Sequence, residues 1–221
     1  NNVGATAVIN GGSYVSNSYT IKNLGTMTIN DGVKVTSTKE STKDETGTWS
    51  GTSLIDNGWY SGSKNTAKTN AVLTINGGDF SYGLNTVKND DYGVAIINGG
   101  TFTANAQAVV MNWNELTING GTYVPNEYLI LNAELTAYEY DAGKLTINGG
   151  NFTIAAGYPA IMMTAGNSGT ALGEIAIADA VSGIDILVPE NENASGTVAF
   201  GANKVTLAGT AGEGGITFSK G

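Results

Sequence analysis

A short motif recurs along the chain: an apolar residue, Thr, Ile, Asn, Gly, Gly, any residue, then an aromatic residue. Its six clear copies carry their Asn at Asn10, Asn30, Asn76, Asn98, Asn119 and Asn148. The 46-residue gap between Asn30 and Asn76 predicts one more, decayed copy, SLIDNGWY, in which Asp56 takes the place of the Asn. Successive copies are then 20 to 29 residues apart. Self-similarity at a period of this size is the signature of a repeat architecture.

A second pattern lies between the copies. A short apolar stretch that ends in Asn follows most of the aromatic positions, with the Asn at Asn23, Asn70, Asn89, Asn112 and Asn132. Each unit therefore reads as strand, glycine turn, short strand, loop, strand and Asn turn. The unit is too short for a propeller blade and too long for a hexapeptide coil. The sequence predicts an all-β fold, a right-handed single-stranded parallel β-helix of about nine coils.

The motif residues have structural roles in such a solenoid. The Ile of each motif points inward by the period-two rule, which concerns Ile9, Ile29, Ile55, Ile75, Ile97, Ile118 and Ile147. An Asn amide can hydrogen-bond the equivalent amide one coil away. We therefore expect two ladders, one formed by Asn10, Asn30, Asn76, Asn98, Asn119 and Asn148, the other by Asn23, Asn89, Asn112 and Asn132. The aromatic residue after each Gly pair is expected to fill a corner of the coil.

Three segments are predicted. Residues 1–174 form the solenoid, residues 35–53 leave it as a polar loop insertion that contains Trp49, and residues 175–221 form either degenerate final coils or a β cap. A cap is expected on general grounds, because a solenoid needs an atypical end to protect its last pairing edge. The first residues carry neither an initiator Met nor a signal-peptide pattern, which predicts an excised or processed segment.

Composition excludes several classes of function. The chain has no His, no Cys and no Arg, and its net charge is −9 with ten scattered lysines. Histidine bases, thiol nucleophiles and Cys/His zinc sites are therefore ruled out. An acidic chain is a poor match to a phosphate backbone, so we expect no nucleic acid partner. No apolar run approaches the roughly 18 residues of a membrane span, so we expect no membrane insertion.

Tandem LTINGGTF units separated by apolar-Asn strands resemble the repeats of β-helical bacterial surface proteins of the adhesin type and of some phage fibre or capsid-decoration domains, over about residues 5–165. The resemblance implies an extracellular, cell-surface or virion-surface location and a non-enzymatic rod that displays loops for adhesion or assembly. The implied partners are neighbouring domains or chains of a larger surface assembly and a host glycan or protein. A homo-oligomer, such as a trimeric fibre, stays open.

Carboxylates gather in the loops before the TIN strands. Aligned coils place five of them in one acidic stripe: Asp90, Asp91, Glu115, Glu139 and Asp141. Like charges this close repel, so the stripe either stays solvated or recruits a cation. Ca²⁺ is the natural candidate, since it accepts carboxylate, carbonyl and water oxygens in flexible geometry.

Aromatic residues occupy the same loops. Tyr92 and Trp113 each lie six residues before a motif Asn, and Tyr140 is close to that position on the next coil. Such side chains either pack over loop backbone or form a platform for sugar rings. Two alternatives to the structural rod follow: a carbohydrate-binding module that uses this platform, and a calcium-dependent polysaccharide lyase that uses the acidic stripe and, for want of His and Arg, a lysine as its base.

Overall fold

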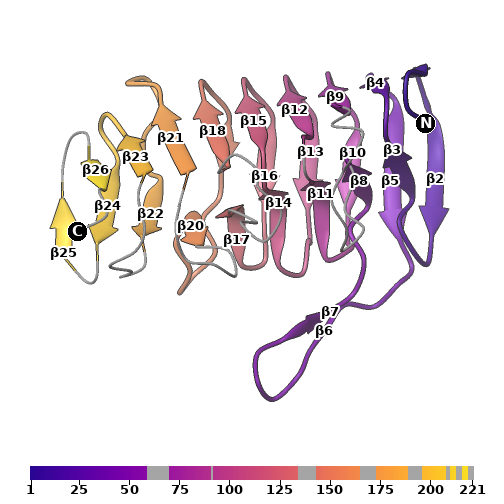
Figure 1. Ribbon diagram of the computed structural model, residues 1–221. Helices are drawn as coiled ribbons and strands as arrows, with labels where there is room; N and C mark the ends of the chain where they lie inside the picture. Colours follow the sequence, from indigo (N-terminus) through magenta and orange to yellow (C-terminus); the bar gives the residue numbers. More distant parts are fainter. Residues whose placement is uncertain are drawn as a thin grey trace.

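The computed structural model describes residues 1–58, 70–90, 92–133, 143–164, 173–188, 196–207, 210–212 and 216–218. Every regular element in these residues is a β-strand (Figure 1). The strands stack side by side from the N-terminal to the C-terminal end of the molecule, and most pair parallel with their neighbours. None of the described residues belongs to a helix that could cross a membrane. The fold is all-β and compatible with a β-solenoid.

Three sheets make up the stack in the described part of the chain. The first contains, in order, β1 (Thr6–Ile9), β4 (Thr26–Ile29), β9 (Val72–Ile75), β12 (Val94–Ile97), β15 (Glu115–Ile118), β18 (Lys144–Ile147), β21 (Gly173–Ile177), β23 (Gly196–Ala199) and β26 (Ile216–Phe218). The second contains β2 (Gly12–Ser16), β5 (Val33–Ser37), β10 (Asp79–Ser81), β13 (Thr101–Thr103), β16 (Thr122–Val124) and β19 (Asn151–Phe152). The third contains β3 (Ile21–Asn23), β8 (Ile55–Asn57), β11 (Asn85–Asn89), β14 (Ala108–Asn112), β17 (Tyr128–Ala133), β20 (Ile161–Thr164), β22 (Asp185–Val188), β24 (Lys204–Leu207) and β25 (Thr210–Gly212).

The register of the first sheet explains why the motif repeats. Each motif Ile pairs with the motif Ile of the next repeat, so that Ile29 lies between Ile9 and Ile75. The pairing continues through Ile97, Ile118, Ile147 and Ile177. Ile29 and Ile75 are fully buried, whereas Ile9, on the first strand, is only partly buried. A one-residue slip would turn this whole row to solvent, so the apolar pattern fixes the register.

The second sheet stacks the aromatic residues of the motif. Phe80, Phe102, Tyr123 and Phe152 form one column, with ring centroids 5.0, 4.8 and 5.1 Å apart. The glycine pair before each ring makes this possible. Gly100 has a φ of 110°, and a Cβ there would lie 3.1 Å from the carbonyl oxygen of Gly78 and 3.3 Å from the Phe102 ring.

The predicted decayed copy is wrong. SLIDN does not pair with the TIN strands: β8 belongs to the third sheet, where Asp56 aligns with Lys22 and Lys88. β4 pairs directly with β9, so the 46-residue gap is one long repeat rather than two. An apolar stretch before Asn-Gly is compatible with both the TIN turn and the Asn turn that follows the third sheet. The sequence pattern alone does not distinguish these two turns. In this repeat, the residue that belongs to the second Asn ladder is Asn57.

The insertion and the tail also differ in detail from the prediction. Val35 is fully buried in β5, so the chain leaves the sheet after Ser37. It then forms an antiparallel hairpin of β6 (Thr42–Lys43) and β7 (Trp49–Ser50), which projects from the side of the stack (Figure 1). At the other end, β21 to β24 extend the parallel sheets, whereas β25 and β26 pair antiparallel with β24 and β23. The described part of this segment thus contains both parallel strands that continue the stack and antiparallel strands at its end.

Candidate functional site

The Asn residues of the TIN turns form an exposed ladder. Asn30 donates from Nδ2 to Asn10 Oδ1 at 2.7 Å, and Asn76 donates to Asn30 at 2.8 Å. Asn98, Asn119 and Asn148 continue the line at 2.8 to 2.9 Å. Every amide therefore donates toward the N-terminal end of the stack.

A second, buried ladder runs along the third sheet and donates the opposite way. Asn23 donates to Asn57, Asn57 to Asn89, Asn89 to Asn112 and Asn112 to Asn132, each at 2.8 to 2.9 Å. The backbone fixes this direction. Asn89 Nδ2, for example, also donates to the carbonyl oxygens of Gly93 and Glu115 at 3.0 and 2.9 Å. Carbonyl oxygens only accept, so the amide nitrogen must face them.

The predicted acidic stripe is described only in part, since Asp91, Glu139 and Asp141 lie outside the described residues. Asp90 follows β11 and is fully buried, whereas Glu115 is an exposed side chain that opens β15 on the first sheet. Lys144 is the register partner of Glu115. Among the described residues, no group of three or more acidic side chains is placed to share a metal ion.

The predicted aromatic platform is also described in part, since Tyr140 lies outside the described residues. Tyr92 is half-buried and has a left-handed φ of 56°. Trp113 is half-buried as well, and Lys88 Nζ lies 4.3 Å from its ring centroid. A cation at this distance makes a cation–π contact with one face of the ring.

Lysine and aspartate alternate across the outer side of the third sheet. Lys22, Asp56 and Lys88 are register partners on β3, β8 and β11. Lys22 Nζ contacts Asp56 Oδ2, and Lys88 Nζ lies 3.2 Å from Asp90 Oδ1. Burial, and then the neighbouring Asp56 carboxyl, raise the pKa of Asp90 well above its ordinary value, although Lys88 opposes the shift. This lysine–aspartate cluster of Lys22, Asp56, Lys88 and Asp90 was missed at the sequence level because its members come from three repeats.

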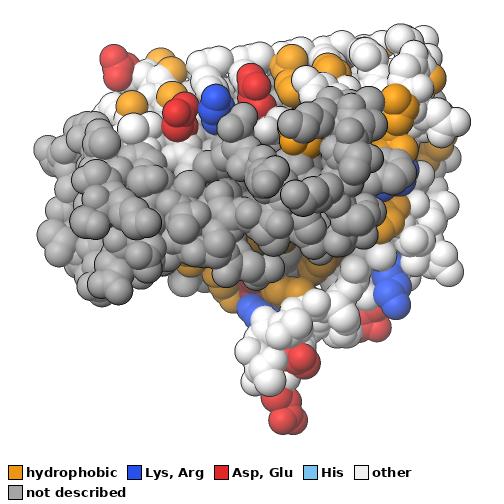
Figure 2. Space-filling model, in the orientation of Figure 1, with side chains coloured by type: hydrophobic (Ala, Val, Ile, Leu, Met, Phe, Trp, Pro, Cys, Tyr) orange, Lys and Arg blue, Asp and Glu red, His pale blue; other side chains and the backbone are white. Residues whose placement is uncertain are grey.

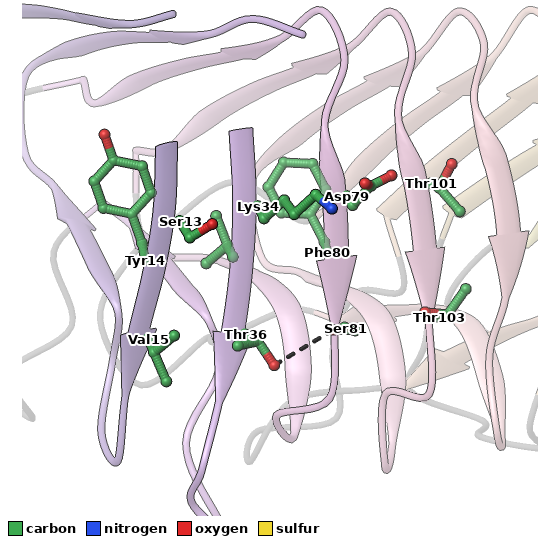
Figure 3. A pocket seen from close by; sticks show the side chains of 11 residues that line it. Ser13, Tyr14, Val15, Lys34, Thr36, Asp79, Phe80, Ser81, Thr101 and Thr103 are labelled. Atoms are coloured by element: carbon green, nitrogen blue, oxygen red, sulfur yellow. Dashed lines mark hydrogen bonds between the residues drawn. The ribbon is translucent and has the colours of Figure 1, made fainter. Parts of the chain in front are cut away.

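The outer face of the second sheet carries a groove with a volume of about 470 Å³. Figure 3 shows side chains from β2, β5, β10 and β13 along it. Five Ser and Thr residues line it, Ser13, Thr36, Ser81, Thr101 and Thr103. Lys34 and Asp79, which are register partners, add one charge of each sign. Thr36 and Ser81 hydrogen-bond each other at 3.4 Å, as Figure 3 shows.

A further cluster ties the projecting hairpin to the stack. Glu127, which is 7% exposed, accepts hydrogen bonds at Oε1 from Lys43 Nζ and Tyr158 OH, both at 2.8 Å. Its Oε2 accepts one from Trp49 Nε1 at 3.3 Å. The Tyr158 ring meets the Tyr128 ring edge-on at 5.2 Å. The sequence singled out Trp49 but gave no sign that a carboxylate about 80 positions away would hold it.

The far end of the hairpin is acidic. Figure 2 shows a narrow protrusion with acidic side chains at its tip. Asp44 and Glu45 follow β6 and are exposed. Asp44 orders the turn, since its Oδ1 accepts from the backbone N–H groups of Thr46 and Thr48 at 2.9 Å each. The pKa of Asp44 is lowered most by the hydrogen bond from the Thr46 hydroxyl, and these backbone hydrogen bonds lower it further.

Comparisons of the chain with protein-family models, with curated proteins and with solved structures gave no match.

Proposed function

We propose that this chain is a non-enzymatic structural and adhesion domain of an extracellular, cell or virion surface. It acts as a right-handed β-helical rod in which each sequence repeat forms one coil. The rod presents the hairpin of β6 and β7 to a host surface or to a partner protein. Neighbouring strands hydrogen-bond along the stack, so we expect stability to be shared along its length.

The anchored hairpin is the observation that supports this proposal best. A purely solvated insertion needs no contacts with the stack, yet Glu127 holds both Lys43 and Trp49, one from each hairpin strand. Lys43 Nζ also lies 5.1 Å from the centre of the Trp49 ring. Loops set on a rigid scaffold are common recognition elements, because their order costs little further entropy on binding.

The groove of Figure 3 supports a second candidate, a carbohydrate-binding module. Its hydroxyl groups, together with Lys34 and Asp79, offer both donors and acceptors to sugar hydroxyls. Val15, which is 59% exposed, contributes an apolar surface at one end. We propose this groove, beside the predicted platform of Tyr92, Trp113 and Tyr140, as a place where a glycan chain would lie.

Binding to arrayed extracellular proteins and arrayed polysaccharides separates the two candidates. The wild-type chain is compared with Glu45→Lys at the hairpin tip and with Lys34→Glu in the groove, two exposed charge reversals. A protein ligand that is lost only with Glu45→Lys supports the adhesion proposal. A polysaccharide lost only with Lys34→Glu supports the carbohydrate module instead. Absence of any ligand, or cleavage of a polysaccharide, contradicts the adhesion proposal.

A further inference from the structure

The Lys22 amine and the Asp56 carboxylate are placed as two reactants. They are register partners on the adjacent parallel strands β3 and β8, and Lys22 Nζ contacts Asp56 Oδ2. The Asp56 side chain is 5% exposed, so the contact lies at the boundary between solvent and the protein interior. Holding an amine against a carboxyl group replaces a bimolecular encounter by an intramolecular one, which greatly raises the reaction rate.

Such a reaction needs a group that transfers protons, and the carboxyl of Asp90 can supply it. Its carboxyl is fully buried: Lys88 Nζ lies 3.2 Å from Oδ1, whereas Oδ2 has no hydrogen-bond partner. Asp56 Oδ1 is also buried without a hydrogen bond. One proton shared by the two carboxyl groups gives these oxygens the donor that they lack. The raised pKa of Asp90, caused by burial and then by Asp56, agrees with a retained proton.

Lys88 is occupied elsewhere, although it is the register partner of Asp56 on the other side. Its Nζ pairs with Asp90 Oδ1 at 3.2 Å and lies over the Trp113 ring. The geometry therefore distinguishes the two lysines, and Lys22 is the one in contact with Asp56.

We propose that the chain joins Lys22 to Asp56 by a side-chain amide bond, with Asp90 as the proton-transfer group. The Lys22 ammonium group first passes one proton to the Asp56 carboxylate, and the resulting neutral amine attacks Cγ of the protonated Asp56 carboxyl, so that a C–N bond forms. One Asp56 C–O bond then breaks: Asp90 gives its proton to the departing oxygen, which leaves as water, and regains a proton from Nζ. The products are one amide and one water molecule, so no oxidant, cofactor or other reactant is needed.

The bond has a structural purpose in the place where it forms. It closes the loop from residue 22 to residue 56, the part of the chain that contains the hairpin insertion. A cross-link of this kind restricts the unfolded chain and stabilises the fold, as a disulfide does in chains that have cysteine. It also replaces a largely buried ion pair by a neutral group, which removes a desolvation cost.

Intact-mass spectrometry of the purified, denatured chain tests the proposal. We expect the wild-type mass to fall below the sequence mass by one water molecule. Lys22→Arg and Asp56→Ala should have their full sequence masses, and Asp90→Asn should keep most of its molecules unlinked. Lys34→Met, which removes an exposed lysine on another sheet, should keep the deficit.

Tryptic mapping places the bond. A linked Lys22 resists trypsin, so residues 1–34 should appear joined to residues 44–64 in one product. This product excludes dehydration at Asp31-Gly32, which lowers the mass equally but joins no peptides. A wild-type chain of full sequence mass, or a mass deficit without the joined peptides, would overturn the proposal whether or not the variants fold.

Discussion

Asn57 Nδ2 donates to Asn89 Oδ1 at 2.8 Å, although 32 positions separate the two residues and both side chains are fully buried. This bond belongs to a ladder that donates toward the C-terminal end of the stack, whereas the exposed ladder of the TIN turns donates toward the N-terminal end. The two rows of amide dipoles therefore oppose each other. The buried row also donates to backbone carbonyls, which fix its direction. A residue of the buried ladder should therefore contribute more to the free energy of unfolding than a residue of the exposed ladder.

Removal of one rung tests that difference. Asn89→Ala deletes donations to Gly93, Glu115 and Asn112 and the acceptor of Asn57. At about 1 kcal/mol for each lost bond, the free energy of unfolding should fall by about 3 kcal/mol or more. The matched change Asn98→Ala, in the exposed ladder, should cost under about 1 kcal/mol because water replaces its partners. Urea unfolding of both variants measures these changes in the free energy of unfolding. Equal decreases would show that burial does not determine how much each ladder residue stabilises the fold.

The aromatic column should be most sensitive at its centre. Phe102 has no exposed surface and stacks on Phe80 and Tyr123 at 5.0 and 4.8 Å. Phe102→Ala should lower the free energy of unfolding by about 3–5 kcal/mol, the usual cost of such a cavity. Tyr14→Ala, at the exposed start of the second sheet, should change it by under about 1 kcal/mol. Similar midpoints in urea for the two variants would contradict the stack as a source of stability.

Glu127 should control the hairpin. Glu127→Ala removes the acceptor of Lys43, Trp49 and Tyr158 together, so the hairpin should detach while the sheets persist. Trypsin should then cleave after Lys43 several-fold faster than in the wild-type chain, and Trp fluorescence should move to longer wavelength. Glu115→Ala, an exposed carboxylate on the first sheet, is the control and should leave the cleavage rate unchanged. An unchanged rate in Glu127→Ala would mean that other contacts hold the hairpin.

Asp90 should make stability depend on pH. Its pKa in the folded chain lies above the value of about 3.9 for an unfolded aspartate. The folded state therefore binds the proton more tightly, and the contribution of Asp90 to stability is full below about pH 4 and falls as the pH rises toward its folded pKa. Asp90→Asn, which cannot ionise, should flatten this fall. Thermal melts from pH 4 to pH 8 should show the two curves separating with rising pH, and parallel curves would exclude the effect.

The repeat made much of the architecture predictable. Ile29 and Ile75 occupy equivalent motif positions, and the structure pairs them directly. The same holds for Asn98 and Asn119, whose amides meet at 2.8 Å. Identical neighbours along a stack reinforce one alignment, so the local pattern and the long-range pairing agree.

The sequence did not predict features that depend on which turn a short motif occupies or on contacts between distant repeats. The sequence pattern places Asp56 in a TIN turn because Asn57-Gly58 follows an apolar run, a feature that both turns of the repeat share. The contacts of Glu127 and the burial of Asp90 were not predictable either, since each depends on side chains from distant repeats. Sequence spacing determines which residues share a row of a stack, but not which insertion folds back onto it.

The fixed position of the hairpin is the central claim of the proposed function, and a distance between two spin labels tests it most directly. The chain has no cysteine, so Glu45→Cys at the hairpin tip and Thr122→Cys on β16 give one defined labelled pair of exposed sites. Pulsed electron paramagnetic resonance should return a narrow distance distribution for this pair, and a broad one when Glu127→Ala is added. A broad distribution in the chain that retains Glu127 would contradict the account, because the rod would then carry a loose loop rather than a displayed one.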